Sequence, residues 1–223
     1  MKKEWIFILI GFMIFTSSAM SQKTTQEKVV RFVIHTDYGN MQGYLYNETP
    51  RHRDNFAKLV KDGYFNDLLF HRVIPGFMIQ GGDPNSRNAK PGVALGSGGP
   101  GYKVAAEFNK NLIHKKGALS AARQGDEINP EKASSGSQFY IVEGRPLSAA
   151  YIEDASRKNG IQYSPEQKAI YESVGGYQWL DGAYTVFGEI TEGLDVITKI
   201  ASVQKDARDR PVQDIKMTIK LID

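Results

Sequence analysis

The stretch FHRVIPGFMIQGGD, from Phe70 to Asp83, combines side chains that seldom occur together. A histidine, an arginine, a glutamine and an aspartate are interleaved with Phe, Val, Ile and Met. Buried strands normally carry fewer polar groups, and solvated loops carry fewer apolar ones. An apolar wall interrupted by a few placed polar groups is typical of a binding site. The stretch therefore places an arginine beside a wall of phenylalanine and methionine, and the purpose of that arginine has to be explained.

The rest of the chain predicts a mainly β fold. Apolar and polar residues alternate in VVRFVIHTDYGNMQGYLY, residues 29–46, on both sides of Asp37–Asn40, which indicates a hairpin. A helix is predicted to begin at Thr49-Pro50, with threonine as the N-cap, and to end at Gly63. A second helix is predicted over Leu194–Val203. Many short strand-like runs, 22 glycines and two scaffold helices predict a closed antiparallel barrel with helices over its ends. The remaining strand-like runs are Leu68–Ile74, Met78–Gly81, Ala118–Ala122, Gln138–Val142, Thr185–Ile190 and Ile215–Ile222.

One segment does not fit that barrel. The 36 residues between Val142 and Trp179 are too many for a hairpin loop. A helix is predicted over Ser148–Asn159 and a second one after Ser164, where Ser164 and Gln167 form a capping box. We therefore expect a helical hairpin, at about residues 147–176, inserted into the β framework.

The first 21 residues have the pattern of a signal peptide. Lys2 and Lys3 precede an apolar run, Trp5–Phe15, and Ala19 and Ser21 are the small residues expected before a cleavage site. A retained membrane anchor is the alternative, although the run is shorter than the ~20 apolar residues that span a bilayer. We expect residues 1–21 to be a signal, 22–28 a short polar tether and 29–223 one domain, exported to the periplasm or cell envelope.

Composition excludes several classes of function. Loss of residues 1–21 would leave 26 basic and 24 acidic residues from the 28 and 25 of the full chain, which gives no electrostatic reason to expect nucleic-acid binding. The chain has no cysteine, so disulfides, thiolate catalysis and cysteine-bound zinc are excluded. We expect no cofactor, no metal and no stable membrane insertion after signal cleavage, and a monomer.

Together with SSGSQFYIV (Ser134–Val142) and WLDGAYTVFG (Trp179–Gly188), the opening stretch resembles the cyclophilins, which are peptidyl-prolyl cis-trans isomerases. The resemblance runs from about Val29 to Asp223 and is interrupted by the insertion. It implies an eight-stranded antiparallel closed barrel capped by two helices. It also implies that the partners are unfolded or folding proteins that contain proline.

The chemistry of the prolyl bond explains why an arginine would be needed at position 72. Delocalisation of the nitrogen lone pair into the carbonyl gives this amide a rotation barrier of ~18–20 kcal/mol. A guanidinium aimed at the nitrogen withdraws the lone pair and favours the twisted state. The resemblance places the catalytic arginine at Arg72. An arginine that only makes structural salt bridges is the alternative.

The resemblance also implies a substrate pocket. Gln80 and Gln138 would bind the substrate backbone and brace the arginine, and the backbone of Ala122 and Arg123 would contact the peptide. Many cyclophilins have histidine at Tyr184 and asparagine at Arg123. Trp179 matches the tryptophan with which many cyclophilins bind cyclosporin, so we expect inhibition that is weakened by these two changes. The residues expected to line the proline pocket are Phe77, Met78, Phe139, Leu180 and Tyr184.

Two other functions remain open. A non-catalytic proline-binding chaperone or interaction module would keep the pocket and lose the arginine, and a small-molecule carrier barrel would have a long apolar lumen. His71 is interpreted as structural, because no nucleophile accompanies it. The insertion is expected to shape access to the site or the choice of client and to take no part in the chemistry. The sequence thus predicts an isomerase that assists the folding of exported proteins.

Overall fold

The structure is a computed structural model that describes Met1 and residues 29–223. The predicted signal peptide, apart from Met1, and the whole of the predicted tether, residues 22–28, lie outside the described residues. Within residues 29–223, no helix is both long and apolar enough to cross a membrane.

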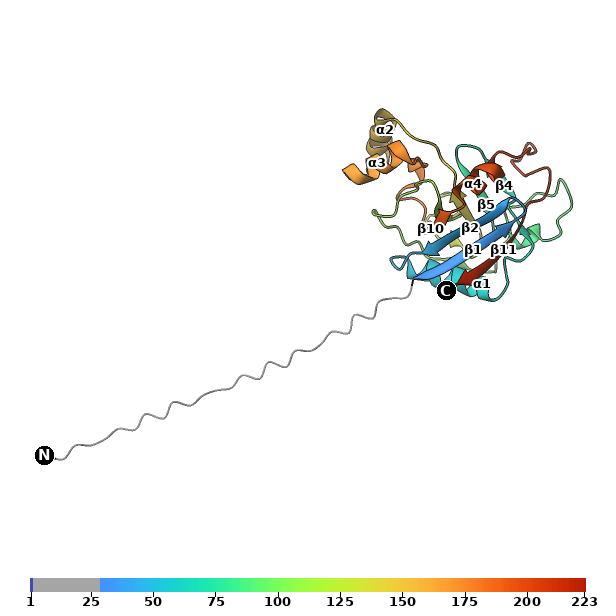
Figure 1. Cartoon of the computed structure of the whole chain (residues 1–223), viewed down its shortest axis with the longest axis horizontal. Coiled ribbons are helices and arrows are strands. Elements are labelled where there is room, and N and C mark those ends of the chain that lie inside the picture. Colours follow the sequence, from blue (N-terminus) through green and yellow to red (C-terminus); the bar gives the residue numbers. More distant parts are fainter. Residues whose placement is uncertain (2–28) are drawn as a thin grey trace.

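Nine strands within residues 29–223 form one antiparallel sheet, in the order β3-β11-β1-β2-β10-β7-β9-β5-β4 (Figure 1). A separate ribbon pairs β6 with β8. The strands are β1 (Val30–Thr36), β2 (Gly39–Leu45), β3 (Leu68–Leu69), β4 (Arg72–Ile74), β5 (Met78–Gly81), β6 (Lys103–Val104), β7 (Ala118–Ala121), β8 (Ser134–Ser135), β9 (Phe139–Val142), β10 (Val186–Glu192) and β11 (Lys216–Ile222).

The two edges of the sheet meet at the opening stretch. Phe70 and His71 separate β3 from β4 in the chain. The N–H of Phe70 donates to the carbonyl of Ile215 at 2.9 Å, and that of His71 donates to Gln80 at 3.0 Å. The curled antiparallel architecture is as predicted. Nine described strands replace the predicted eight, and β3 and β4 are not hydrogen-bonded neighbours, so the ring of strands is incomplete where the chain steps from one edge to the other.

Two helices cover the core of the curled sheet. α1 (Pro50–Lys61) and α4 (Leu194–Ala201) contribute buried residues to the same apolar cluster as β1, β2, β9 and β11. Thr49 is at the N-cap of α1, but its hydroxyl makes no capping hydrogen bond. The carboxylate of Glu107 accepts the first N–H groups instead, from Arg51 at 3.1 Å and His52 at 3.0 Å. A carboxylate suits this place because a helix N-terminus is electropositive.

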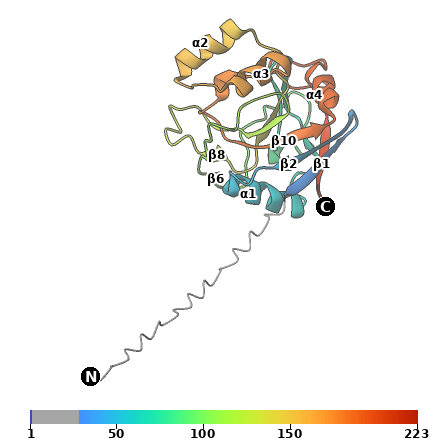
Figure 2. The same cartoon turned by 60° about the vertical axis from the view of Figure 1, so that its left-hand side comes forward.

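The insertion is a helical hairpin, as predicted. It comprises α2 (Ala149–Asn159) and α3 (Pro165–Ser173), with the capping box of Ser164 and Gln167 formed and Gly160 in the left-handed conformation. Its own apolar cluster, built around Ile152, Tyr163 and Tyr171, includes Ile113 of the framework. Figures 1 and 2 both show α2 and α3 on the side of the molecule opposite α1. Two short 3-10 turns, Pro84–Ser86 and Gln178–Leu180, complete the described elements.

Candidate active site

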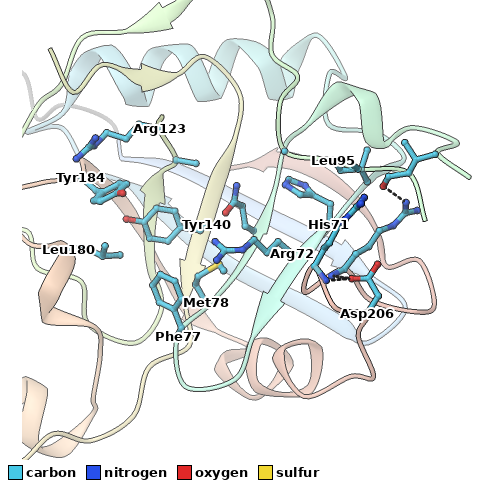
Figure 3. A pocket seen from close by; sticks show the side chains of 17 residues that line it. His71, Arg72, Phe77, Met78, Leu95, Arg123, Tyr140, Leu180, Tyr184 and Asp206 are labelled. Carbon is cyan, nitrogen blue, oxygen red and sulfur yellow. Dashed lines mark hydrogen bonds between the residues drawn. The ribbon is translucent and has the colours of Figure 1, made fainter. Parts of the chain in front are cut away.

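A cavity of about 360 Å³ opens between β4, β5 and the loops around them (Figure 3). It gathers eight of the eleven residues predicted for the site, and Gln138 lines an adjoining cavity of about 550 Å³. The eight are Arg72, Phe77, Met78, Gln80, Ala122, Arg123, Leu180 and Tyr184. These residues come from segments more than a hundred positions apart, and the curled sheet brings them together.

Arg72 stands in the middle of this cavity, on β4 (Figure 3). Its side chain is 42% exposed, and its Nε lies 3.8 Å from Oδ2 of Asp209. Asp209 pairs more closely with Lys205, at 2.6 Å. The contact with Asp209 is therefore loose and leaves the guanidinium fork accessible from the cavity.

The two glutamines of the site bind each other. Gln80 lies opposite Arg72 in the register of β4 and β5, and its Nε2 donates to Oε1 of Gln138 at 3.1 Å. Nε2 of Gln138 donates in turn to the carbonyls of Gly96 and Gly98, at 2.9 and 2.7 Å. This bonding holds the glycine-rich loop against the site. The two glutamines were predicted to brace Arg72. Of this bracing, the contacts show only that Gln80 lies beside the arginine.

Asp83, the last residue of the opening stretch, fixes the same loop. It is fully buried, and its carboxylate accepts from the N–H groups of Asn85 and Gly96. A Cβ added to Gly98 would stand 2.1 Å from Asp83 Oδ1. Glycine is therefore required at position 98, where the loop passes over the carboxylate. Asp83, at the polar end of the Phe70–Asp83 stretch, thus helps to build the wall of the cavity.

The apolar wall consists of Phe77, Met78, Leu180 and Tyr184, as predicted, and of Tyr140, which was not predicted. Phe139 does not belong to it. It is 1% exposed and meets Phe56, Phe65 and Phe70 edge-on in the main core. Neighbouring residues of a strand point to opposite faces, so Tyr140 and not Phe139 faces the site. The alternation within Phe139–Val142 is the signal by which the sequence could have identified Tyr140.

Arg123 forms one rim of the cavity. Its guanidinium lies 4.4 Å from the centre of the Tyr184 ring and donates to the carbonyl of Ala183 and to Asp126. The hydrogen bond from Arg123 lowers the pKa of the Asp126 carboxyl. The cation that replaces the usual asparagine is therefore paired with a carboxylate. It also stacks on the ring of Tyr184, which occupies the position of the usual histidine.

Trp179 is near the site but does not line either cavity. Its Nε1 donates to the hydroxyl of Tyr151 in α2 at 2.9 Å, and the two rings meet edge-on at 5.7 Å. The amine of Lys158 lies 5.3 Å from the centre of the indole ring. The insertion thus occupies the indole N–H group and places a lysine amine over the ring.

His71 lines the cavity on the far side of Arg72 (Figure 3). It is 4% exposed, and neither ring nitrogen has a hydrogen-bonding partner within the described part of the chain. Burial lowers the pKa of His71 to about 4, so the ring is neutral near pH 7. A neutral, buried ring agrees with a structural role.

A second histidine has the contacts of a hydrolytic triad. Nδ1 of His52 lies 2.6 Å from the Glu107 carboxylate, and Nε2 lies 2.9 Å from the hydroxyl of Ser134. Ser134 is 1% exposed and His52 is 3% exposed. A nucleophile enclosed in this way cannot reach a substrate. The group instead ties the start of α1 to β8.

No pattern in the sequence predicted the loops that complete the cavity. Residues 93–95 and the segment around Arg208 lie far from any recognisable pattern, yet they form its far side. Asp206 shapes that segment by accepting the N–H groups of Arg208 and Arg210, at 2.8 and 3.0 Å. Over the described residues, no three His, Cys, Asp or Glu side chains are grouped so as to hold a metal ion.

Known proteins similar to this chain share its sequence and architecture. The family model described as "Cyclophilin type peptidyl-prolyl cis-trans isomerase/CLD" matches residues 31–220. A protein of Staphylococcus saprophyticus, named "Putative peptidyl-prolyl cis-trans isomerase", is 36% identical over 190 residues, or 83% of this chain and 88% of that protein. A protein of the same name from Staphylococcus haemolyticus is 34% identical over 90% of this chain and 94% of its own length.

Solved structures agree on the fold. A crystal structure of a cyclophilin type peptidyl-prolyl cis-trans isomerase from Cryptosporidium parvum superimposes with a TM-score of 0.62 at 24% identity, covering 88% of this chain and 99% of that one. A second structure of that isomerase, in the presence of the dipeptide Ala-Pro, gives a TM-score of 0.61 at 23% identity, over 86% and 99%.

Proposed function

Because the chain belongs to the cyclophilin-type peptidyl-prolyl cis-trans isomerase family, we propose that it isomerises X-Pro bonds with Arg72 as the catalytic residue. The observation that carries the assignment of Arg72 is its position. It is an arginine with an accessible guanidinium that projects into a cavity walled by Phe77, Met78 and Leu180.

The reaction requires no bond to an enzyme group. The apolar wall grips the proline ring, while the carbonyl on the other side of the amide rotates. As conjugation is lost, the nitrogen becomes pyramidal and its lone pair becomes available to a hydrogen-bond donor. The guanidinium of Arg72 donates to it, and this bond stabilises the twisted state more than either planar isomer. The amides of Gln80 and Gln138 lie beside this path and orient the peptide backbone.

Substitution of Arg72 by alanine tests the assignment. We expect kcat/KM for a proline-containing peptide to fall by about 100-fold, the usual effect of removing a preorganised donor. Arg72→Lys keeps the charge but not the planar fork and should be intermediate. The measurement is a protease-coupled cis-trans assay, with the fold checked by circular dichroism. Equal turnover by wild type and a folded Arg72→Ala protein would exclude Arg72 as the catalytic residue. A rate no faster than the uncatalysed one in both proteins would favour the alternative, a non-catalytic proline-binding module.

We also propose that the enzyme works outside the cytoplasm on unfolded or folding proteins that contain proline. This proposal rests on the sequence pattern of residues 1–21 and on the absence of cysteine. In a bacterial host that expresses the full chain, mass spectrometry of the extracytoplasmic protein should find an N-terminus at Gln22. A chain that retains Met1 would instead indicate an uncleaved anchor.

A further inference from the structure

A continuous line of buried hydrogen bonds connects the helical insertion to the proline pocket. It begins with two tyrosines of the insertion. The hydroxyl of Tyr163 donates to Oδ2 of Asp181 at 2.8 Å, and the hydroxyl of Tyr171 donates to the same oxygen at 2.5 Å. Tyr171 is fully buried, and Asp181 is 6% exposed. The insertion therefore supplies two of the donors that this buried carboxylate requires.

The other oxygen of Asp181 holds a histidine of the framework. Oδ1 lies 2.7 Å from Nδ1 of His114 and accepts the backbone N–H of His114 at 2.8 Å. Because an ionised carboxylate only accepts hydrogen bonds, Nδ1 carries the proton. In the neutral ring Nε2 is then an acceptor, and it lies 3.0 Å from the hydroxyl of Tyr140. Asp181 thus determines both the tautomer and the orientation of His114.

Tyr140 connects these hydrogen bonds to the proline pocket. Its ring is stacked on His114, with centres 6.0 Å apart and planes 11° apart, and it meets Tyr184 edge-on at 6.1 Å. It packs in one cluster with Met78 and Ala122 and lines the cavity that contains Arg72. The position of the Tyr140 ring therefore helps to set the width of the pocket.

We propose that Tyr163 and Tyr171 are positioning residues of the isomerase, which act through Asp181 and His114 to hold the Tyr140 ring in the wall of the proline pocket. The inference rests on the proposed function of that pocket. Without the two hydroxyls, Oδ2 of Asp181 would be a buried acceptor with no donor, which is costly. The carboxylate would then rotate or bind a water molecule. Its hydrogen bond to His114 would weaken, and the Tyr140 ring would be less firmly positioned.

This role predicts a particular kinetic signature. The pocket wall contacts the proline ring in the cis, trans and twisted states alike, so loosening it weakens all three equally. A loss of such uniform binding raises KM and leaves kcat nearly unchanged. Loss of the Arg72 interaction, which is made in the twisted state, lowers kcat instead.

The test is a double-mutant cycle. Tyr163→Phe and Tyr171→Phe, singly and together, remove the hydroxyls and keep the rings. We expect the double variant to raise KM for a short proline peptide about fivefold to tenfold, with kcat changed less than twofold. This is a small part of what two hydrogen bonds to a charged group contribute, because the loss at Asp181 reaches the pocket only through the position of Tyr140. In a Tyr140→Phe background, where the line of hydrogen bonds is already cut, the same pair should change KM less than twofold.

Controls separate this result from general destabilisation. Tyr44→Phe, which also removes a hydroxyl bonded to a carboxylate, Glu189, but outside both cavities, should keep the wild-type KM. Urea unfolding would show that each variant is native under assay conditions. If the double variant does not fold, the same comparison is made with Tyr163→Phe alone. An unchanged KM in a folded Tyr163→Phe, Tyr171→Phe protein, or equal effects in both backgrounds, would overturn the proposal. Absence of turnover in wild type would instead refute the proposed function.

Discussion

Tyr151 and Trp179 show how one contact alters what a binding surface can offer. The indole N–H of Trp179 is a donor that a ligand at the rim of the pocket could use. Here it is satisfied by the hydroxyl of Tyr151, and Lys158 lies over the ring. A ligand that needs this donor must first break an existing hydrogen bond, and its net gain is small because one bond replaces another.

This contact leads to a prediction for cyclosporin. We expect measurable but weak inhibition of the wild-type enzyme, and tighter inhibition of Tyr184→His, which restores the usual rim residue. Tyr151→Phe should also tighten inhibition, by about threefold to tenfold, because the indole N–H then has no internal acceptor. Inhibition constants from a titration of the peptide assay would test both. Tighter inhibition of wild type than of either variant would contradict the prediction.

At the scale of elements, the insertion is joined to the framework at its exit. Gly176 bridges to both Lys115 and Arg145, and the carbonyl of Gly175 accepts the N–H of Lys116. Tyr177, immediately after the insertion, packs against the pocket residue Phe77 with ring centres 4.3 Å apart. The insertion is thus held against the wall of the site. Its expected influence on access and client choice stays a prediction.

Two glycines of this element should respond differently to alanine. A Cβ at Gly176 would stand 2.3 Å from the His114 carbonyl oxygen and 2.6 Å from the ring of Tyr171. At Gly160 nothing lies within 4 Å, and the strain is that of its left-handed φ of 68°. We expect Gly160→Ala to lower the free energy of unfolding by about 1 kcal/mol and Gly176→Ala by about 3 kcal/mol.

Urea unfolding followed by fluorescence measures both losses. Gly160→Ala is the matched control, because it makes the same change of one methyl group in the same insertion without a clash. Equal losses for the two variants would show that the insertion does not pack on His114 as described.

At the scale of the whole molecule, stability should depend on pH through buried histidine. Burial lowers the pKa of His71 from its ordinary 6.5 to about 4. The unfolded chain therefore binds more protons than the folded one between these values. The stabilisation from the neutral ring is complete above pH 6.5 and is lost as the pH falls toward 4. Burial also lowers the pKa of His52, which gives a contribution of the same sign.

For His71 alone, this linkage amounts to a loss of about 2 kcal/mol in the free energy of unfolding between pH 7 and pH 5. His71→Gln removes the titrating group and leaves His52 in place, so its unfolding free energy should depend less on pH by that amount. The measurement is urea denaturation of both proteins at the two pH values. Parallel pH dependences would exclude His71 as the source.

The sequence by itself determined the features that depend on near neighbours in the chain. Strand alternation, the β1–β2 turn, the capping box of Ser164 and the stop at Gly160 are local, because each is set by residues a few positions apart. Phe70–Asp83, together with Ser134–Val142 and Trp179–Gly188, pointed to the family and predicted Arg72 as the catalytic residue, since these motifs carry their own chemistry.

Only the tertiary structure decided which groups complete the site. His114, Tyr140, Tyr171 and Asp181 are hydrogen-bonded in one line although up to 67 positions separate them in the chain. The motifs predict that Trp179 binds cyclosporin and that Phe139 lines the proline pocket, but Tyr151 of the insertion accepts the indole N–H of the first and the core encloses the second. A buried donor or acceptor must find its partner wherever the fold places one. That choice depends on how the sheet curls and where the insertion packs, and no local pattern in the sequence records either.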